Sequence, residues 1–559
     1  MYIKRLEIKN FRGIKNLKWD LPEGLVCLIG NGDSCKTTIL NAIELSLLHH
    51  WNFNIQDTDF YNCDFSNNIE IITTIGDVPT ELLTIEKFGT YIRKNVDLGT
   101  ENDEPENEEY YLTIKLEITS DFEPEWSVIN NRMEKKSISH RDRAKLHLYR
   151  IGENFDKDFS LGRNSILNLY MENKEDINHQ IIDILKRHKS ENIENEEIKK
   201  SLEKMSNILD DYNISREEQL NLILQISSGT INISNLNLCD GKIPVSKKGI
   251  GTQRLISSTL NLGVSSKDSS IMIDEVEYGL EPYRLSDLLT KLIENSAKRT
   301  ILLTSHSTIP LTELEYNNIL LCSNDNGYIS CKSIPKDMEN LLRSSSYAFL
   351  SKKILSVEGA TEYGILKELN HLWSKEDKSL SYYNSLVLDG KGGSKAVKTS
   401  LSFLDLGYYS GLFIDSDNAE ANKEGEEAKK KGVKLFTWNN NVDIETRIVN
   451  DVPFILLKEI INIVVELVNN ESAISRFEMK FGKKTIDFEE LNKDISEDEF
   501  RKKLIEVLVY KKDKDKGLKS VKYGRLLGKF IVENMDKINE ESELLKTIND
   551  IKKWYSNEQ

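Results

Sequence analysis

Residues 30–38 read GNGDSCKTT and directly follow a short apolar run, LVCLI. The stretch fits the phosphate-binding pattern G-x-x-x-x-G-K-[ST] at Gly30, Lys36 and Thr37, whereas Cys35 stands where the second glycine belongs. A helix is expected to begin at this loop, and its first backbone N–H groups and its dipole favour anions. The stretch therefore predicts an α/β domain that binds a nucleotide, with Lys36 at the β- and γ-phosphates and Thr37 on Mg²⁺.

Further parts of an ATPase site follow along the chain. The apolar segment IMIDE ends in Asp274, which would hold Mg²⁺, and in Glu275, which would orient or deprotonate the attacking water. The segment LLTSHS places His306 where a γ-phosphate sensor belongs, and Gln56 follows the first helix, where a metal-contacting glutamine belongs. Each piece alone is common, but their order favours an ATP site. The predicted nucleotide-binding residues are Gly30, Asn31, Gly32, Lys36, Thr37, Thr38, Gln56, Asp274, Glu275 and His306, with Thr37 and Asp274 as Mg²⁺ ligands.

The segment SKKGIGTQRL, residues 246–255, precedes the IMIDE strand and leads into an expected helix. Its Ser246, Gly249 and Gly251 are typical of a signature loop that caps ATP from a second subunit.

Cys35 is the departure from the phosphate-loop pattern. Its Cβ and sulfur are expected to crowd the loop near the phosphates, so we expect ATP to bind and its hydrolysis to be slow or absent. The alternative is that cysteine is small enough to be neutral.

A second group of chemically active residues lies beyond residue 350. Glu358 ends an apolar segment and Glu362 follows four residues later, on the same side of an expected helix. Asp415 and Asp417 end another strand, where alternation would place both on one face, and Glu445 comes later. Clustered carboxylates repel one another unless cations neutralise them, and hard oxygen ligands favour Mg²⁺ or Mn²⁺. The pattern predicts a two-metal site that cleaves phosphodiesters.

Two further features could border this metal site. Lys522 is our choice for the cation that stabilises developing charge, in a region rich in lysine. The segment LVLDGKGGSKA contains a glycine turn with Asp389, Lys391, Gly392 and Gly393. A plain strand-to-helix turn explains that segment equally well.

Composition limits the class of protein. The chain has 559 residues, 39% of them hydrophobic, which allows about two to four domains. A net charge of −16 argues weakly against nonspecific coating of nucleic acid, and the six scattered cysteines indicate neither a disulfide framework nor a zinc site. The sequence has no signal peptide and no apolar run of the roughly 18 residues that a membrane span needs. We therefore expect a cytoplasmic protein without a membrane partner.

The pattern of strands and helices predicts the domain organisation. We expect an ATPase domain formed by residues 1–165 and 236–345, interrupted by a charged helical insertion at residues 166–235. The segments INHQIIDILKRH and EEIKKSLEKMSNILDDY predict the helices of that insertion. A separate α/β domain is expected over residues 350–559, and it ends in lysine-rich helices.

The motifs FRGI, IDEVEYGLEP, TSHS, EGATE and DSD, in this order, resemble the OLD (overcoming lysogenisation defect) family of nucleases over nearly the whole chain. The chain looks especially similar to anti-phage versions such as the Gabija nuclease subunit and retron-associated OLD effectors. The resemblance implies an N-terminal ABC-type ATPase domain with a helical dimerisation insertion, and a C-terminal Toprim α/β domain with helical additions. Glu281 departs from the histidine that many relatives carry in the loop across the ATP interface.

The resemblance also implies a homodimer or larger oligomer and Mg²⁺- or Mn²⁺-dependent cleavage or nicking of DNA. Matched to the family's motifs, the metal ligands or acid–base groups are Glu358, Glu362, Asp415, Asp417 and Glu445. ATP with Mg²⁺ would gate the nuclease, or a defence-system partner would do so. That partner would be a reverse transcriptase with its RNA–DNA product, or a helicase.

Two other functions remain open at the level of sequence. One is a nucleotide-binding scaffold or sensor that does not cut, and the other is a Toprim nuclease that acts on RNA, including tRNA. A transporter ATPase is disfavoured because nothing after residue 350 suits it. A topoisomerase is disfavoured because no domain is suited to supply a nucleophilic tyrosine.

Overall fold

The structure is a computed structural model, and it divides into two compact units, Met1–Phe349 and Leu350–Gln559. It describes residues 1–47, 54–93, 110–152, 158–161, 165–171, 196–214, 216–224, 236–264, 269–297, 299–376, 379–468, 470–509 and 518–556.

The first unit is built on one sheet, whose described strands run in the order β7-β6-β5-β4-β1-β2-β15-β14-β3-β13-β12-β8. These strands are β1 (Tyr2–Phe11), β2 (Ile14–Asp20), β3 (Gly24–Ile29), β4 (Ile69–Gly76), β5 (Tyr111–Ile118), β6 (Pro124–Ile129), β7 (Lys135–Ser137), β8 (Leu148–Ile151), β12 (Ser270–Ile273), β13 (Thr300–Thr304), β14 (Ile319–Asp325) and β15 (Tyr328–Ser333). The sheet from β7 to β2 is antiparallel, and all of its neighbouring strands except β1 and β4 are also consecutive along the chain.

The other part of this sheet is parallel. Strands β8, β12, β13, β3 and β14 pair in parallel, and β3, β12 and β13 consist of apolar runs that are buried almost throughout. A run without alternation is typical of a strand covered on both faces. Because parallel strands end at the same edge, the segments that follow β3, β12 and β13 meet there. These segments contain the GNGDSCKTT loop, Asp274 and His306.

The helices of the first unit include α1, which begins at the GNGDSCKTT loop, and α6 and α7, which flank the strand β12. Their bounds are α1 (Lys36–Leu47), α2 (His140–Arg143), α3 (Ile166–Tyr170), α5 (Glu196–Asp211), α6 (Ile250–Val264), α7 (Pro282–Glu294), α8 (Ile309–Glu313) and α9 (Glu339–Ser344).

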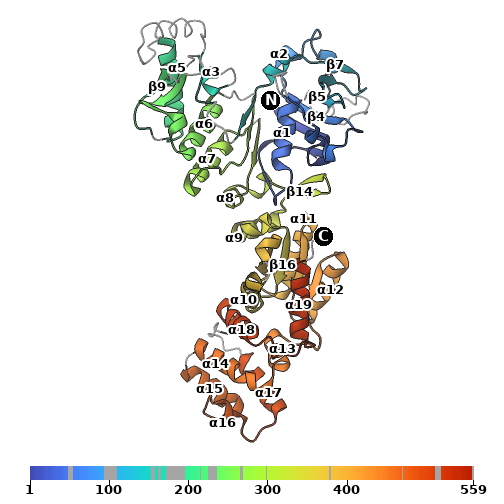
Figure 1. Ribbon diagram of the computed structural model, residues 1–559, viewed down its shortest axis with the longest axis vertical. Coiled ribbons are helices and arrows are strands. Elements are labelled where there is room, and N and C mark those ends of the chain that lie inside the picture. The colour runs from blue at the N-terminus through green and yellow to red at the C-terminus, as the bar shows by residue number, and fades with distance from the viewer. Residues whose placement is uncertain are drawn as a thin grey trace. The chain divides into compact units, whose positions relative to one another are not determined.

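The insertion at residues 166–235 is not purely helical, which corrects the expectation from sequence. Helix α5 is present as predicted, but β9 (Leu220–Leu224) pairs antiparallel with β10 (Leu236–Asp240), and β11 (Ile243–Pro244) completes a small sheet. In Figure 1 α3, α5 and β9 lie together in this region. The segment LNLIL has the two-residue period of a strand, which the charged helical sequence before it concealed. The predicted helix INHQIIDILKRH lies outside the described residues.

The second unit contains a parallel sheet in the order β17-β16-β18-β19. Its strands are β16 (Lys353–Val357), β17 (Ser385–Asp389), β18 (Tyr409–Phe413) and β19 (Lys434–Phe436). The central strand β16 is buried throughout and leads into α10, as the sequence predicts. Because all four strands are parallel, the segments after β16, β17 and β18 meet at one edge, and these contain Glu358, the glycine turn and the DSD motif.

Helices surround this sheet and continue beyond it. They are α10 (Ala360–Glu376), α11 (Gly393–Leu406), α12 (Ala419–Lys431), α13 (Ile444–Asp451), α14 (Leu457–Val468), α15 (Asn470–Phe481), α16 (Phe488–Asn492), α17 (Glu497–Leu508), α18 (Val521–Glu533) and α19 (Glu543–Ser556). One apolar core joins the sheet to most of these helices. Among the described residues, no helix is both long and apolar enough to cross a bilayer.

Helices α10 and α18 cross with their backbones almost touching. A Cβ added to Gly524 would lie 2.2 Å from the carbonyl oxygen of Thr361, and a Cβ added to Gly364 would lie 2.5 Å from that of Val521. Neither position therefore has room for a side chain, so both must be glycine. The crossing fixes the segment before α18 relative to the first turn of α10.

Candidate nucleotide and metal-binding sites

The GNGDSCKTT loop wraps around the ammonium group of Lys36. Its Nζ donates to the carbonyl oxygens of Gly30 and Asn31, both at 3.1 Å, and to Ser34 Oγ at 3.0 Å. Burial lowers the pKa of Lys36, while nearby acidic and thiol groups oppose that effect. The predicted lysine thus lies at the centre of the loop. Of the other predicted loop residues, Gly32 and Thr37 are exposed, and Asn31 and Thr38 are partly exposed.

Cys35 adopts the backbone conformation of the glycine that it replaces. Its φ is +62°, in the left-handed region, which costs a residue with a Cβ about 1–2 kcal/mol. Its sulfur lies 3.5 Å from Asn324 Nδ2, and a Cβ added to Gly13 of the FRGI turn would lie 2.8 Å from that sulfur. The Cys35 side chain therefore packs against two neighbouring turns.

Asp274 accepts hydrogen bonds from three side chains at the predicted nucleotide site. Its Oδ1 accepts hydrogen bonds from Thr37 Oγ1 at 3.0 Å and from Thr304 Oγ1 at 2.7 Å, and its Oδ2 accepts one from Arg150 Nη2 at 3.0 Å. Arg150 also forms an ion pair with Glu44 of α1. The two predicted Mg²⁺ ligands, Thr37 and Asp274, are thus in direct contact. Sequence reasoning missed both Arg150, which belongs to no local motif, and Thr304, which lies in the quoted segment LLTSHS but was not selected.

His306 is exposed, and its backbone is held by an acidic residue that the sequence analysis did not select. Glu277 accepts from the His306 backbone N–H at 2.6 Å and from Ser305 Oγ at 2.8 Å. Partial burial and the Lys36 ammonium lower the pKa of His306. Glu275, the predicted partner of the attacking water, has a φ of +46° and donates its backbone N–H to Thr304 Oγ1 at 2.8 Å. Glu277 could have been found from its position in IDEVE.

Gln56 lies away from the hydrogen bonds around Asp274. Its exposed side chain precedes the short helical turn Asp57–Asp59, and its backbone N–H donates to Asp59 Oδ2 at 3.0 Å. Asp59 in turn accepts from Arg12 Nε of the FRGI turn at 2.8 Å. Within the described residues, no hydrogen bond joins Gln56 to Thr37 or Asp274. The predicted glutamine loop is thus anchored to the β1–β2 turn.

The predicted signature loop leads into α6 and contacts the strand end at Asp274. A Cβ on Gly251 would lie 2.4 Å from the carbonyl oxygen of Gly279, so this glycine is required by space. The fully buried Arg254 of α6 donates to the backbone carbonyls of Asp274 and Glu275, the latter at 3.1 Å. Helix α6 is therefore tied by hydrogen bonds to the end of β12.

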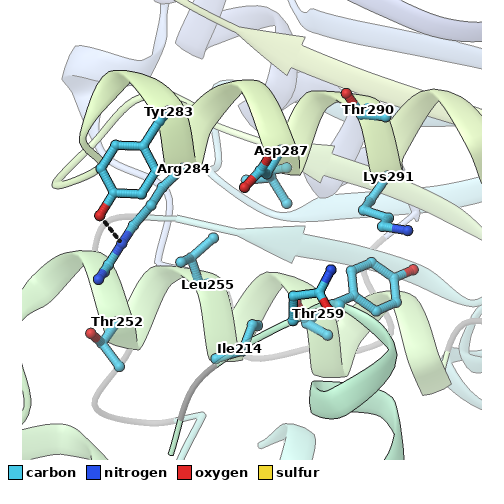
Figure 2. A pocket seen from close by; sticks show the side chains of 12 residues that line it. Ile214, Thr252, Leu255, Thr259, Tyr283, Arg284, Asp287, Thr290 and Lys291 are labelled. Carbon is cyan, nitrogen blue, oxygen red and sulfur yellow. Dashed lines mark hydrogen bonds between the residues drawn. The ribbon is translucent and has the colours of Figure 1, made fainter.

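A cavity of about 360 Å³ lies between α6 and α7, as Figure 2 shows. Thr252, Leu255 and Thr259 line it from α6, and the aromatic ring of Tyr283 and the side chain of Lys291 line it from α7. None of the predicted nucleotide-binding residues lines this cavity. It is separate from the Lys36 loop.

In the second unit three carboxylates converge. One oxygen from each of Glu358, Asp415 and Asp417 can be chosen so that all lie within 4.8 Å of one another. Glu358 follows β16 and accepts from the backbone N–H of Asp415 through Oε2 at 3.0 Å. Asp415 is buried, and among the described residues its Oδ1 has no hydrogen-bond partner. Three carboxylates grouped in this way offer the hard oxygen atoms that divalent cations such as Mg²⁺ prefer as ligands.

Asp415 and Asp417 are brought together by a different element from the strand that the sequence predicts. Strand β18 ends at Phe413, so Asp415 and Asp417 lie in the loop before α12 and not on the strand. Strand alternation therefore does not explain their common direction. The loop is held by Ser416, which donates Oγ to the carbonyl of Val442 at 3.2 Å and accepts from the Val442 backbone N–H at 2.9 Å.

Glu362 and Glu445 lie behind these three carboxylates, both deeply buried. Burial together with neighbouring carboxylates raises the pKa of Glu362 to about 7 and that of Glu445 to about 8. The same causes raise the pKa of Glu358, and they raise that of Asp415 well above its ordinary value. Of the five predicted carboxylates, three form the close group, and these two form its buried surroundings.

Lys519, which the sequence analysis did not select, is a cation beside this group, and the choice of Lys522 stays a prediction. The charge of Lys519 opposes the rise in pKa at Glu358, Glu362 and Glu445. Lys522, three residues later, is exposed on α18. No sequence motif distinguishes these two lysines.

Two further segments border the carboxylates. In the glycine turn after β17, a Cβ added to Gly393 would lie 3.6 Å from Glu358 Oε1, and the backbone N–H of Gly392 donates to the carbonyl oxygen of Glu358 at 2.8 Å. Lys391 and Asp389 of the same turn hydrogen-bond to each other at 2.9 Å. Asp443, which the sequence analysis missed, caps α13 and raises the pKa of Glu445 by its charge.

A family model described as an AAA ATPase domain matches residues 1–309 of the chain, more than half of its length. The chain belongs to this AAA ATPase family. The matched AAA ATPase region contains every residue predicted to bind the nucleotide. It ends before the second unit, so the carboxylate group lies outside it.

One curated relative is the Old nuclease of Escherichia phage P2. It is 28% identical over 173 residues, which cover 26% of this chain and 30% of the relative. The chain thus matches less than a third of the length of that relative.

Solved structures show weaker likeness to the AAA ATPase unit. An Smc head bound to the C-winged helix domain of ScpA has a TM-score of 0.40 at 14% identity, and covers 61% of this chain and 100% of its own. RecF, the recombination mediator protein, has a TM-score of 0.36 at 14% identity, with coverages of 59% and 98%. TM-scores this low add nothing to the assignment of the fold.

Proposed function

We propose that the chain is a metal-dependent nuclease whose second unit is a Toprim-like domain and whose AAA ATPase unit gates it. The observation that carries the proposal is the convergence of Glu358, Asp415 and Asp417 around a buried carboxylate oxygen that has no partner in the part of the chain that the structure describes. This arrangement is costly unless a cation neutralises it. The partial similarity to the Old nuclease supports a nuclease.

The residues present fit Mg²⁺ or Mn²⁺, because all of the converging groups are hard carboxylate oxygens. Glu358, Asp415 and Asp417 would hold the metal, with Glu362 and Glu445 as further ligands or acid–base groups. When bound, two such ions activate a water and stabilise the leaving oxygen of a phosphodiester.

The protein's own groups would orient the substrate. Asp415 is fixed by its backbone bond to Glu358, which sets the direction of the close group. Lys519 would offset the negative charge that develops on the phosphate. Glu362 and Glu445 have raised pKa values near neutrality and can therefore exchange protons there.

For the AAA ATPase unit we propose ATP with Mg²⁺, held by Lys36, Thr37 and Asp274. Arg254 would transmit the state of the Asp274 strand end to α6, and hence to the signature loop that faces a second copy. A nucleotide shifts such an equilibrium only through different affinities for the two states. We expect slow hydrolysis because of Cys35, so that ATP acts as a conformational input.

The wider role follows from the same proposal. The substrate is DNA, the chain works as a homodimer or larger oligomer, and the insertion at residues 166–235 contributes to that contact. Its setting is cytoplasmic anti-phage defence, with a reverse transcriptase and its RNA–DNA product, or a helicase, as partner.

Incubation of the purified chain with plasmid DNA and with tRNA tests the proposal, in Mg²⁺ or Mn²⁺ and in EDTA. We expect metal-dependent cleavage of DNA that Asp415→Asn removes. The matched control is Asp498→Asn, an exposed aspartate at the start of α17 in the same unit. Cleavage of tRNA alone would favour an RNA nuclease. Cleavage of neither substrate, with ATP present or absent, would favour a scaffold and contradict the proposal.

A further inference from the structure

Two cysteines face each other in the hairpin formed by β14 and β15. The hairpin turns at Asn326 and Gly327, both with positive φ, which is typical of a two-residue type I′ turn. In such a hairpin the pair next to the turn exchanges hydrogen bonds, and the pairs alternate from there. Counting back along the register, Cys322 and Cys331 form a non-hydrogen-bonded pair. The Cα atoms of such pairs lie about 4.5 Å apart, within the range of disulfides.

The two sulfur atoms are already close, at 3.4 Å. A disulfide needs about 2.05 Å, so a small local movement suffices. Cys322 is buried, whereas Cys331 is partly exposed and therefore accessible to a small reagent.

The hairpin also forms a wall of the Lys36 loop. A Cβ on Gly30 would lie 2.4 Å from the carbonyl oxygen of Cys322, so the loop's first glycine rests directly on the cysteine backbone. Two residues later, Asn324 donates Nδ2 to the carbonyl oxygen of Asp33 at 3.1 Å. A change in the spacing of β14 and β15 therefore acts on the phosphate loop at both Gly30 and Asp33.

We propose that Cys322 and Cys331 are a reversible oxidation site that takes a small-molecule disulfide, such as glutathione disulfide, and that their disulfide weakens nucleotide binding. The Cys331 thiolate attacks one sulfur of the reagent, whose S–S bond breaks and releases one thiolate. The Cys322 thiolate then attacks the Cys331 sulfur of the mixed disulfide and releases the second. The two protein thiols are oxidised, the reagent is reduced to two thiols, and the two protein protons end on them.

The rate of this exchange depends on the fraction of thiolate. Contact with the Cys322 thiol and partial burial both raise the pKa of Cys331. The exchange is therefore slower at neutral pH than that of an exposed thiol, and it continues to accelerate above the pH at which an exposed thiol is fully ionised.

The experiment uses the full chain, reduced and then incubated in glutathione buffers of increasing oxidising strength. Differential alkylation with mass spectrometry reads the Cys322–Cys331 disulfide, and a fluorescent ATP analogue reads nucleotide affinity. We expect the disulfide to form and the affinity to fall by about fivefold or more, with recovery after dithiothreitol. Nucleotide binding is measured apart from cleavage, so the outcome is independent of the proposed nuclease.

Two single variants control the experiment. Cys331→Ser should keep its affinity in every buffer, and Cys331→Ala serves in its place if the hydroxyl perturbs the hairpin. Cys63→Ser, which removes an exposed cysteine outside the hairpin, should respond as the wild type does. Absence of the Cys322–Cys331 disulfide in the most oxidising buffer would overturn the site. A disulfide that leaves the affinity unchanged would overturn its coupling to the loop.

Discussion

The two sites of this chain satisfy their charges in opposite ways. In the AAA ATPase unit, Lys36 has three acceptors from its own loop, and Asp274 accepts from Thr37, Thr304 and Arg150. In the second unit, three carboxylates converge, and a buried oxygen of Asp415 has no partner among the described residues. Both sites use the ends of parallel strands. The charges of the first site are neutralised by neighbouring protein groups, whereas the second site groups like charges.

The largest expected effect follows from this contrast. In EDTA, Asp415→Asn should be more stable than the wild type, because it removes a buried carboxylate from a group of like charges. In Mg²⁺ or Mn²⁺ the order should reverse. A metal at about 100 times its Kd stabilises the wild type by about 2.7 kcal/mol, and the variant should lose that gain. Thermal unfolding with and without metal measures both. Equal metal-induced stabilisation of the two proteins would contradict a metal site at Asp415.

Removing the ammonium group of Lys36 tests the nucleotide site. Lys36→Ala should weaken ATP binding by about tenfold to a hundredfold, because hydrogen bonds to charged groups contribute roughly 1.5–3 kcal/mol. If the AAA ATPase unit gates the nuclease, cleavage by this variant should no longer respond to ATP. The measurements are nucleotide affinity, and cleavage with and without ATP. If cleavage by the variant still responded to ATP as that of the wild type does, this would contradict the proposal that the AAA ATPase unit gates the nuclease.

The pH dependence of stability should distinguish the two sites. Glu362 and Glu445 have folded-state pKa values of about 7 and about 8, above the ordinary 4.5, so both bind protons more tightly in the folded chain. Their contribution is fully present below pH 4.5 and is lost as the pH rises through these two values. In EDTA, the free energy of unfolding should therefore fall over that range.

Urea unfolding across pH in EDTA measures this slope. Bound metal should reduce it, because metal binding releases the protons that the carboxyl groups hold. Glu445→Gln should reduce the slope as well, because it removes one of the two titrating groups. A slope that neither metal nor this variant alters would show that other groups determine the pH dependence.

The smallest effect concerns Cys35. Cys35→Gly should relieve a left-handed conformation that costs about 1–2 kcal/mol, but it also loses the packing of the sulfur against Asn324. Cys63→Gly is the matched control, since Cys63 is exposed and has a φ of +55°. Both variants should gain stability, and only Cys35→Gly should raise ATP turnover. Equal turnover in the two variants would mean that Cys35 is neutral in the loop.

Local motifs predicted the features that depend on neighbouring residues. The buried strand before the Lys36 loop, the strand β12 before Asp274, and the segment from β16 to Glu358 are all present in the structure. Each combines an apolar run with a turn, and that pattern is sufficient because strand and turn lie together in sequence.

Features that depend on distant contacts were missed. Arg150 and Lys519 belong to no motif, and their positions are set by strand pairing and helix packing. Asp415 and Asp417 were selected from their spacing on an expected strand, yet they meet Glu358 through a loop. The strand β9 was missed because a strongly charged helix precedes it.

The glycine contact between α10 and α18 has a consequence for substitutions at Gly364 and Gly524. Glu362 lies on the first turn of α10, and Lys519 lies just ahead of α18, so the helix crossing sets the spacing of opposite charges beside the carboxylates. A methyl group at Gly364 or Gly524 would act as a wedge between the helices. If the second unit is the proposed nuclease, such substitutions would abolish its activity while every acidic and basic residue stays in place, so a genetic screen for loss of activity should recover changes at these two glycines.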